Sequence, residues 1–151
     1  PQEIDDFVAF VLAGGEVSAF NLRQHVMNAQ CISFLRGSRC LVGVAGLKQP
    51  LPSYRERVQK GAAFVLTQEA FPFELGWVFI LPSRRGEKLS LPLCRPVVAA
   101  AGSAGVFATS RTDNTGMHTT LKKLGFLRVG SEWASKQNDG NLVLFANNAA
   151  I

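Results

Sequence analysis

The chain has 151 residues, of which 47% are hydrophobic and 18% charged, so it fits one domain with an ordinary apolar core and is not a disordered chain. Its net charge of +5 favours an anionic partner, either a phosphorylated cofactor or nucleic acid. The three cysteines show no CxxC spacing and there are only two histidines, so we expect no metal site.

Cysteine usage and hydropathy also bear on location. An odd number of cysteines fits the reducing cytoplasm better than a disulfide framework. The apolar run from Phe7 to Leu12 lacks the basic flank of a signal peptide, and no apolar stretch reaches the ~18 residues of a membrane span. We therefore expect a cytoplasmic protein without a membrane segment.

The first half of the chain shows the pattern of two helices, two strands and a helical turn. The expected helices cover residues 5–12 and 18–28, the strands 31–35 and 40–47, and the helical turn 54–60. Asp5 or Asp6 is a candidate cap for the first helix, and Gly14 ends it. Residues 36–39 join the two strands as a hairpin turn.

The second half alternates strands and helices and ends in a hairpin. The expected strands cover 74–81, 106–109, 126–135 and 142–145, and the helices 89–101 and 114–124. Pro96 should kink or shorten the first of these helices, and Gly125 suits the end of the second. Asn138, Asp139 and Gly140 form the expected turn between the last two strands.

The segment ELGWVFILPSRRGEKLS, from Glu74 to Ser90, carries the clearest chemical signal. An apolar strand leads into a basic turn that contains glycine, and a helix follows. Free backbone N–H groups and the helix dipole both favour anions at such a helix N-terminus. The turn therefore predicts a phosphate-binding site.

Three pieces of the sequence, in this order, resemble the GNAT superfamily of acyl-CoA-dependent N-acyltransferases. They are the segment from Glu74 to Ser90, FATSRTDNTGM from Phe107 to Met117, and LKKLGFLRVGSEW from Leu121 to Trp133. The resemblance implies an α/β fold in which residues 1–151 form a single three-layer domain, with a mixed, mostly antiparallel central sheet flanked by helices.

The resemblance also implies a site for acetyl-CoA or another acyl-CoA. The strand from Glu74 would splay from the strand that starts at Val106, and the pantetheine arm would pair with the exposed backbone while the turn wraps the pyrophosphate. The implied binding residues are Phe79, Ile80, Leu81, Arg84, Arg85, Gly86, Glu87, Lys88, Leu89, Ser90 and Asn114. Lys88 and Ser90 depart from the family pattern, which has glycine and then glycine or alanine at these two positions.

Acyl transfer to an amine needs a base for the amine, a hydrogen bond to the thioester oxygen and a proton for the leaving thiolate. Glu74 stands where the superfamily often places the base, with water as the alternative, and an N–H near Phe79 or Ile80 could polarise the carbonyl. The family's acidic tyrosine is replaced by Leu121. The sole tyrosine, Tyr54, together with Ser110 and His118, supplies the other candidates for that role.

Three interpretations stay open. The first is an N-acetyltransferase, a monomer or homodimer, that acts on a primary amine of an unknown acceptor. The segment from Leu47 to Lys60 forms an acceptor-side loop suited to an acidic or planar molecule, with Trp77 and Trp133 as candidate pocket residues. The second is a non-catalytic module that binds CoA or another anion. The third is a nucleic-acid-associated protein that uses its basic turn.

Overall fold

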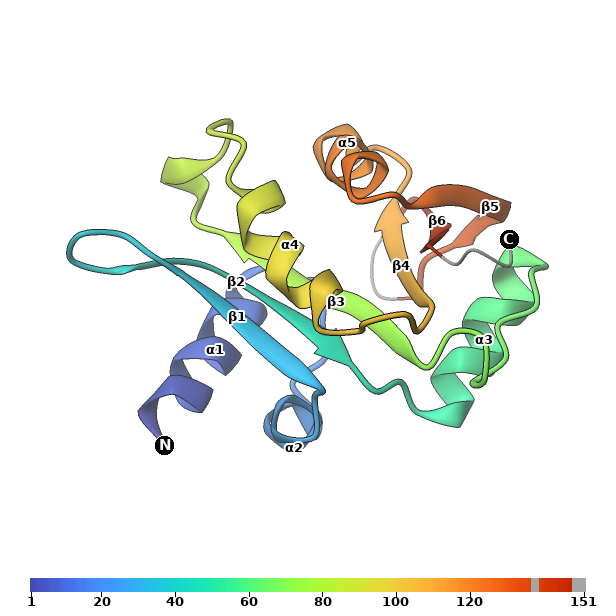
Figure 1. The fold of residues 1–151 in the computed structure, drawn as a ribbon, viewed down its shortest axis with the longest axis horizontal. Coiled ribbons are helices and arrows are strands. Elements are labelled where there is room, and N and C mark those ends of the chain that lie inside the picture. Colours follow the sequence, from blue (N-terminus) through green and yellow to red (C-terminus); the bar gives the residue numbers. More distant parts are fainter. Residues whose placement is uncertain (137–138, 148–151) are drawn as a thin grey trace.

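The computed structural model describes residues 1–136 and 139–147 (Figure 1). The helices and strands follow one another in the expected order. They are α1 (Gln2–Ala13), α2 (Leu22–Met27), β1 (Cys31–Arg36), β2 (Leu41–Lys48), α3 (Pro52–Ala62), β3 (Phe73–Ile80), the single-turn helix η1 (Pro82–Arg84), α4 (Ser90–Ala99), β4 (Val106–Arg111), α5 (Thr115–Lys123), β5 (Leu127–Ala134) and β6 (Asn141–Asn147).

The strands form one six-stranded sheet in the order β1-β2-β3-β4-β6-β5. Every neighbouring pair is antiparallel except β3 and β4, which run parallel. These two strands pair only where Phe73 faces Val106 and Glu74 faces Phe107, and beyond that point they diverge (Figure 1). The predicted mixed sheet and the predicted splay at its centre are both confirmed.

Helices cover both faces of the sheet, which gives the three-layer arrangement. On one face, α4 and α5 pack through Leu93, Val97 and Leu121 on apolar residues of β2, β3, β4 and β6. On the other face, α1 and α2 cover the β2–β3 half of the sheet, and α3 covers the β4–β6 half. On this second face each half of the sheet therefore has its own packed layer. Burial of these apolar side chains stabilises the fold by ~25 cal/mol per Å² of apolar surface.

A β-bulge interrupts β3 next to the splay. The register with β2 shifts between Val44 and Gly46, and Trp77 takes the left-handed φ of 55°. A side chain on Gly46 would meet the Trp77 ring at 2.6 Å, so only glycine leaves room for this indole. The ring then packs edge-on against Phe7 of α1. A bulge bends the strand that carries it, and this one lies on β3 beyond the two residue pairs that join β3 to β4.

Several element boundaries differ from the sequence prediction. Helix α1 begins at Gln2, and neither Asp5 nor Asp6 caps it. Helix α2 is shorter than the predicted range 18–28: it begins at Leu22, and Phe20 lies before it with 79% of its surface exposed. Helix α4 continues three residues beyond Pro96 and ends at Ala99, two residues before the predicted end. Of the predicted turn between the last strands, Asn138 lies outside the described residues.

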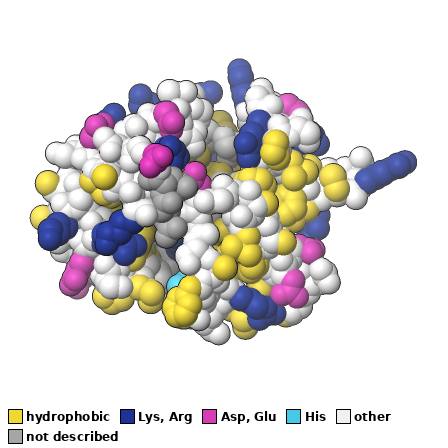
Figure 2. All heavy atoms as spheres, turned by 180° about the vertical axis from the view of Figure 1, so that it is seen from behind, with side chains coloured by type: hydrophobic (Ala, Val, Ile, Leu, Met, Phe, Trp, Pro, Cys, Tyr) yellow, Lys and Arg dark blue, Asp and Glu magenta, His cyan; other side chains and the backbone are white. Residues whose placement is uncertain are grey.

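The caps of α5 agree with the prediction. Asn114 caps the helix by accepting a hydrogen bond from the Met117 N–H, and Gly125 follows its end with a φ of 90°. In the described ranges no helix has the length and apolar character needed to cross a membrane. Figure 2 shows that the basic side chains on one face are separated by neutral and acidic ones, so they form no continuous stripe there.

Candidate active site

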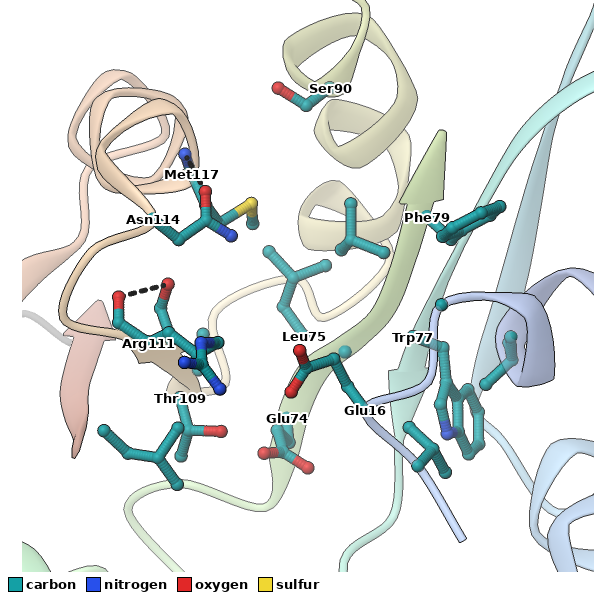
Figure 3. Close-up of a pocket in the computed structure, with 18 of the residues that line it drawn as sticks. Glu16, Glu74, Leu75, Trp77, Phe79, Ser90, Thr109, Arg111, Asn114 and Met117 are labelled. Atoms are coloured by element: carbon teal, nitrogen blue, oxygen red, sulfur yellow. Dashed lines mark hydrogen bonds between the residues drawn. The ribbon is translucent and has the colours of Figure 1, made fainter. Parts of the chain in front are cut away.

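A cleft of about 1130 Å³ opens where β3 and β4 diverge. Its walls come from β3 and α4 on one side and from β4 and α5 on the other. Figure 3 shows Glu74 and Thr109 at one end of this gap, and Ser90 and Asn114 at the other, on the helices. The splayed sheet therefore connects the predicted phosphate turn with the predicted base through one continuous space.

The predicted phosphate turn, residues 82–91, presents a row of backbone N–H groups that have no acceptor among the described residues. The N–H groups of residues 86–91 donate no hydrogen bond within the described part of the chain. Gly86 and Lys88 both have positive φ, 84° and 59°, which turns this backbone toward the N-terminus of α4. Lys88 thus adopts the conformation that glycine supplies in the family motif, at a cost of about 1 kcal/mol.

Two of the predicted cations in the turn already have partners. Arg84 forms a two-bond ion pair with Glu87, with distances of 2.9 and 3.1 Å. Arg85 donates through Nε to the Ile80 carbonyl at 3.0 Å and lies over the Phe79 ring. Lys88 is exposed and lines the cleft without an ion pair in the described residues. The turn therefore contains both a carboxylate that neutralises one of its cations and a free lysine.

The edge of β3 that faces the gap exposes Ile80. The Leu81 N–H donates to the Val42 carbonyl on β2 at 2.9 Å. Because backbone groups alternate along a strand, the Ile80 N–H and carbonyl point away from β2 and toward the gap. Of the two positions considered from the sequence for polarising a carbonyl, the geometry favours Ile80 over Phe79.

Glu74 lies at the narrow end of the cleft and is only 2% exposed. The Tyr54 hydroxyl donates to its Oε2 at 2.6 Å. Lys48, directly opposite on β2, places Nζ 3.0 Å from Oε1. This contact lies outside hydrogen-bond geometry, so Oε1 has no hydrogen-bond donor among the described residues. The carboxylate is buried as an ion pair and retains one oxygen able to accept a proton or a hydrogen bond.

The structure brings Tyr54 from α3 to this carboxylate, which sequence spacing alone does not reveal. Burial and the charge of Glu74 raise the pKa of Tyr54 well above its ordinary value of 10.0, while a hydrogen bond with Thr109 lowers it less. Tyr54 therefore keeps its proton at neutral pH. In this arrangement the Glu74 carboxylate can accept a proton and the Tyr54 phenol can supply one.

The other predicted catalytic candidates have different surroundings. Ser110 is buried on β4 and lines the cleft, with its hydroxyl 3.4 Å from the Arg111 carbonyl. His118 Nε2 lies in hydrogen-bond contact with the same carbonyl at 2.9 Å, and its ring contacts the Phe145 ring. Leu121 is fully buried in the core. Of the candidates for the acid, only Tyr54 reaches Glu74.

Lys48 is the residue of this site whose contact with Glu74 the sequence analysis missed. Its signal is weak: a single lysine ends a buried strand, directly opposite a glutamate that begins another. Its ammonium lies 5.0 Å from the Trp77 ring centroid and 5.3 Å from that of Tyr54. Trp77 and Trp133 both line the cleft, and Trp133 also packs against Gly61 of α3. Both tryptophans thus serve packing as well as the cleft.

No group of three or more histidine, cysteine or acidic side chains is placed to hold a metal ion within residues 1–136 and 139–147. The three cysteines are free thiols. Cys94 is buried, and burial raises its pKa to about 12, while Cys40 lies exposed near the β1–β2 turn. None of the three lines the cleft, so the site offers no thiol nucleophile.

Comparison with known proteins relates this geometry to a fold family. No protein-family model and no curated protein sequence matches the chain. Solved structures do match.

A ribosomal-protein-alanine N-acetyltransferase from Brucella melitensis is 14% identical with a TM-score of 0.69, covering 97% of this chain and 94% of that one. NAA60 of Arabidopsis thaliana, in complex with acetyl-CoA, is 12% identical with a TM-score of 0.68, covering 100% and 96%. An acetyltransferase of the GNAT family from Streptococcus agalactiae is 14% identical with a TM-score of 0.64, covering 98% and 91%. The chain therefore has the GNAT fold, as the sequence motifs predicted.

Proposed function

We propose that this protein is an acyl-CoA-dependent N-acyltransferase that moves an acetyl or similar acyl group from acyl-CoA to a primary amine. The whole chain, residues 1–151, would form the one catalytic domain, working in the cytoplasm as a monomer or homodimer. The observation that carries the proposal is the buried Glu74 carboxylate, hydrogen-bonded to Tyr54 at the narrow end of the cleft that leads to the phosphate turn.

An acyl-CoA fits the residues along this cleft. The unused N–H groups of residues 86–91 and the side chain of Lys88 would hold the pyrophosphate, and Asn114 lines the same end of the cleft. The exposed backbone of Ile80 would pair with the pantetheine arm in the way that a neighbouring strand would. When bound, the thioester supplies an activated acyl carbon. Arg85 now bonds the Ile80 carbonyl. It would have to release this carbonyl, and its charge would then join that of Lys88 at the pyrophosphate.

The chain's own residues would then manage the protons. Glu74, or a water that it orients, accepts a proton from the amine as nitrogen bonds to the acyl carbon and the carbon–sulfur bond breaks. The Ile80 N–H stabilises the carbonyl oxygen. Tyr54 supplies a proton to the sulfur and regains one from Glu74. Starting from an ammonium, the products are an amide, free CoA thiol and one proton released to solvent.

A second candidate function is binding of CoA or another anion without turnover. It is favoured by the loss of the family's tyrosine at Leu121 and by the Arg84–Glu87 ion pair inside the turn. Both features would weaken catalysis or affinity without disturbing the fold. The third interpretation, nucleic-acid binding, gains no support from the face seen in Figure 2, where neutral and acidic side chains separate the basic ones.

Calorimetric titration with acetyl-CoA is the test. Micromolar binding to the purified protein, lost in Arg85→Ala and kept in Arg95→Ala, would support the cofactor site; Arg95 is an exposed arginine of α4 outside the cleft. Release of CoA thiol with a panel of amines then separates an enzyme from a binding module. An absence of binding at millimolar acetyl-CoA would overturn the proposal.

A further inference from the structure

A second hollow, of about 260 Å³, adjoins the cleft on the side of α3. It shares His25, Lys48, Tyr54, Arg57 and Trp77 with the cleft, so the two spaces meet beside Glu74. The phosphate turn lies at the other end of the cleft and does not line the hollow. The hollow is therefore placed to hold the part of an acceptor that extends beyond its reacting amine.

The side chains around this hollow are basic and aromatic. Arg57 and Lys48 each lie 5.3 Å from the centroid of the Tyr54 ring. Lys48 is paired with Glu74, whereas Arg57 is exposed and makes no ion pair within the described residues. No aspartate or glutamate lines the hollow. The unneutralised charge of Arg57 thus has room for an anion beside it.

The backbone at the start of α3 also favours an anion in the hollow. Helix α3 begins at this hollow, where Leu51, Ser53 and Tyr54 all line its wall. The N-cap residue is Leu51, which provides no side-chain cap. Pro52, the first residue of the helix, has no N–H, so the available donors near Arg57 are the N–H groups of Ser53 and Tyr54. These donors and the positive end of the helix dipole both attract negative charge.

Where the cleft adjoins the hollow, it contains a buried carboxylate. Glu74 is buried there, and its Oε1 has no hydrogen-bond donor among the described residues. Glu16, from the loop after α1, also lines the cleft (Figure 3). Carboxylates at this point suit an ammonium, and the cations in the hollow suit an anion.

From this juxtaposition we infer that the acceptor is a zwitterion: a primary amine that carries a carboxylate or another anionic group on the same molecule. This inference rests on the proposed function and narrows its substrate class. The amine lies against the Glu74 carboxylate, whose Oε1 it shares with Lys48 Nζ at 3.0 Å. The anionic group lies in the hollow, against Arg57 and the N-terminus of α3. An amine with a second positive charge would meet Arg57 and Lys48 and be rejected.

Binding of matched amines to the CoA-saturated protein tests the inference without needing turnover. The probes are β-alanine and γ-aminobutyrate, their uncharged counterparts n-propylamine and n-butylamine, and the dication putrescine. We expect calorimetry to show the amino acids binding at least about tenfold more tightly than the alkylamines, and putrescine more weakly than either, since one charge-assisted hydrogen bond contributes about that factor. A peptide with an N-terminal aspartate distinguishes a peptide acceptor from a free amino acid.

Variants locate the anionic group. Arg57→Gln should weaken the amino acids about tenfold and leave the alkylamines unchanged, and Arg57→Lys should restore most of the loss. Arg95→Gln removes the same charge outside both spaces and should change neither. The affinity for acetyl-CoA should be the same in all of these variants.

The outcomes separate this inference from the function on which it rests. Selective binding of amino acids, lost in Arg57→Gln, supports the inference even if no thiol is released, in which case the proposed catalysis fails. Turnover of alkylamines or putrescine as fast as amino acids overturns the inference while catalysis stands. An equal loss of affinity for all probes in Arg57→Gln overturns the inference, and thiol release then decides separately whether catalysis stands. Equal binding of all probes, without turnover, overturns both.

Discussion

The two ends of the cleft are built in different ways. The phosphate turn comes from ten consecutive residues, 82–91, and its donors are backbone N–H groups. The opposite end combines Lys48, Tyr54 and Glu74 from β2, α3 and β3, and its chemistry depends on side chains. A backbone site tolerates changes of side chain as long as φ and ψ persist, whereas a side-chain site depends on each residue. Lys88 shows this tolerance, because it keeps a positive φ where the family has glycine.

The largest expected effect is at the side-chain end. Glu74→Gln removes the proposed base and should lower turnover by about 10²-fold or more, while acetyl-CoA affinity stays the same. Glu56→Gln, on an exposed position of α3, is the matched control. Thiol release and calorimetry together check this. Turnover within about threefold of the unchanged protein would leave water as the only base.

The bulge that separates the two ends is the next target. Gly46→Ala places a methyl group 2.6 Å from the Trp77 ring, which packs edge-on against Phe7, so the free energy of unfolding should fall by about 1–3 kcal/mol. Gly116→Ala, on α5, meets nothing within 4 Å and should be neutral or slightly stabilising. Urea unfolding of both variants measures the difference. Equal stabilities would mean that the bulge does not require glycine opposite the indole.

At the side-chain end, the free energy of unfolding should depend on pH through the phenol of Tyr54. Its folded-state pKa is raised, by burial first and then by Glu74, so the unfolded chain loses this proton more readily than the folded protein. The stabilisation is complete below the unfolded pKa of 10.0 and should be lost as the pH rises above that value. Tyr54→Phe should remove this part of the pH dependence.

Because Tyr54 is the sole tyrosine, phenolate absorbance reports on it alone. We expect the native protein to titrate well above the ordinary tyrosine range, and the Glu74→Gln variant to titrate lower, since one raising charge is gone. A native titration at an ordinary tyrosine pKa would show that the phenol does not lie buried against the carboxylate.

The smallest expected effect is at the backbone end. Lys88→Gly removes the charge and the strain of a left-handed lysine, and Lys88→Ala removes only the charge. If backbone N–H groups dominate binding, both variants should bind acetyl-CoA within about tenfold of the unchanged protein, with glycine the tighter of the two. Calorimetry at two salt concentrations measures this. A loss far beyond tenfold in both variants would assign the site to the lysine charge instead.

The sequence predicted the parts of the fold and site that depend on consecutive residues better than the parts that depend on distant ones. The order of the elements, the strand–turn–helix around Arg85 and the Asn114 cap depend on local patterns, and the structure agrees with them. The predicted starts of α1 and α2 were wrong: Asp5 and Asp6 lie inside α1 without capping it, and α2 begins only at Leu22. Local signals predict local structure, since propensity and capping act within a few residues.

The sequence by itself determined the fold, the basic turn at a helix N-terminus and the glutamate at the start of the central strand. Only the tertiary structure decided that Tyr54 contacts Glu74, that Lys48 neutralises it and that Arg57 borders a hollow free of acidic residues. The reason is physical. A turn and its dipole are set by neighbours in the chain, whereas contacts among α3, β2 and β3 depend on how the sheet register and helix packing bring distant residues together.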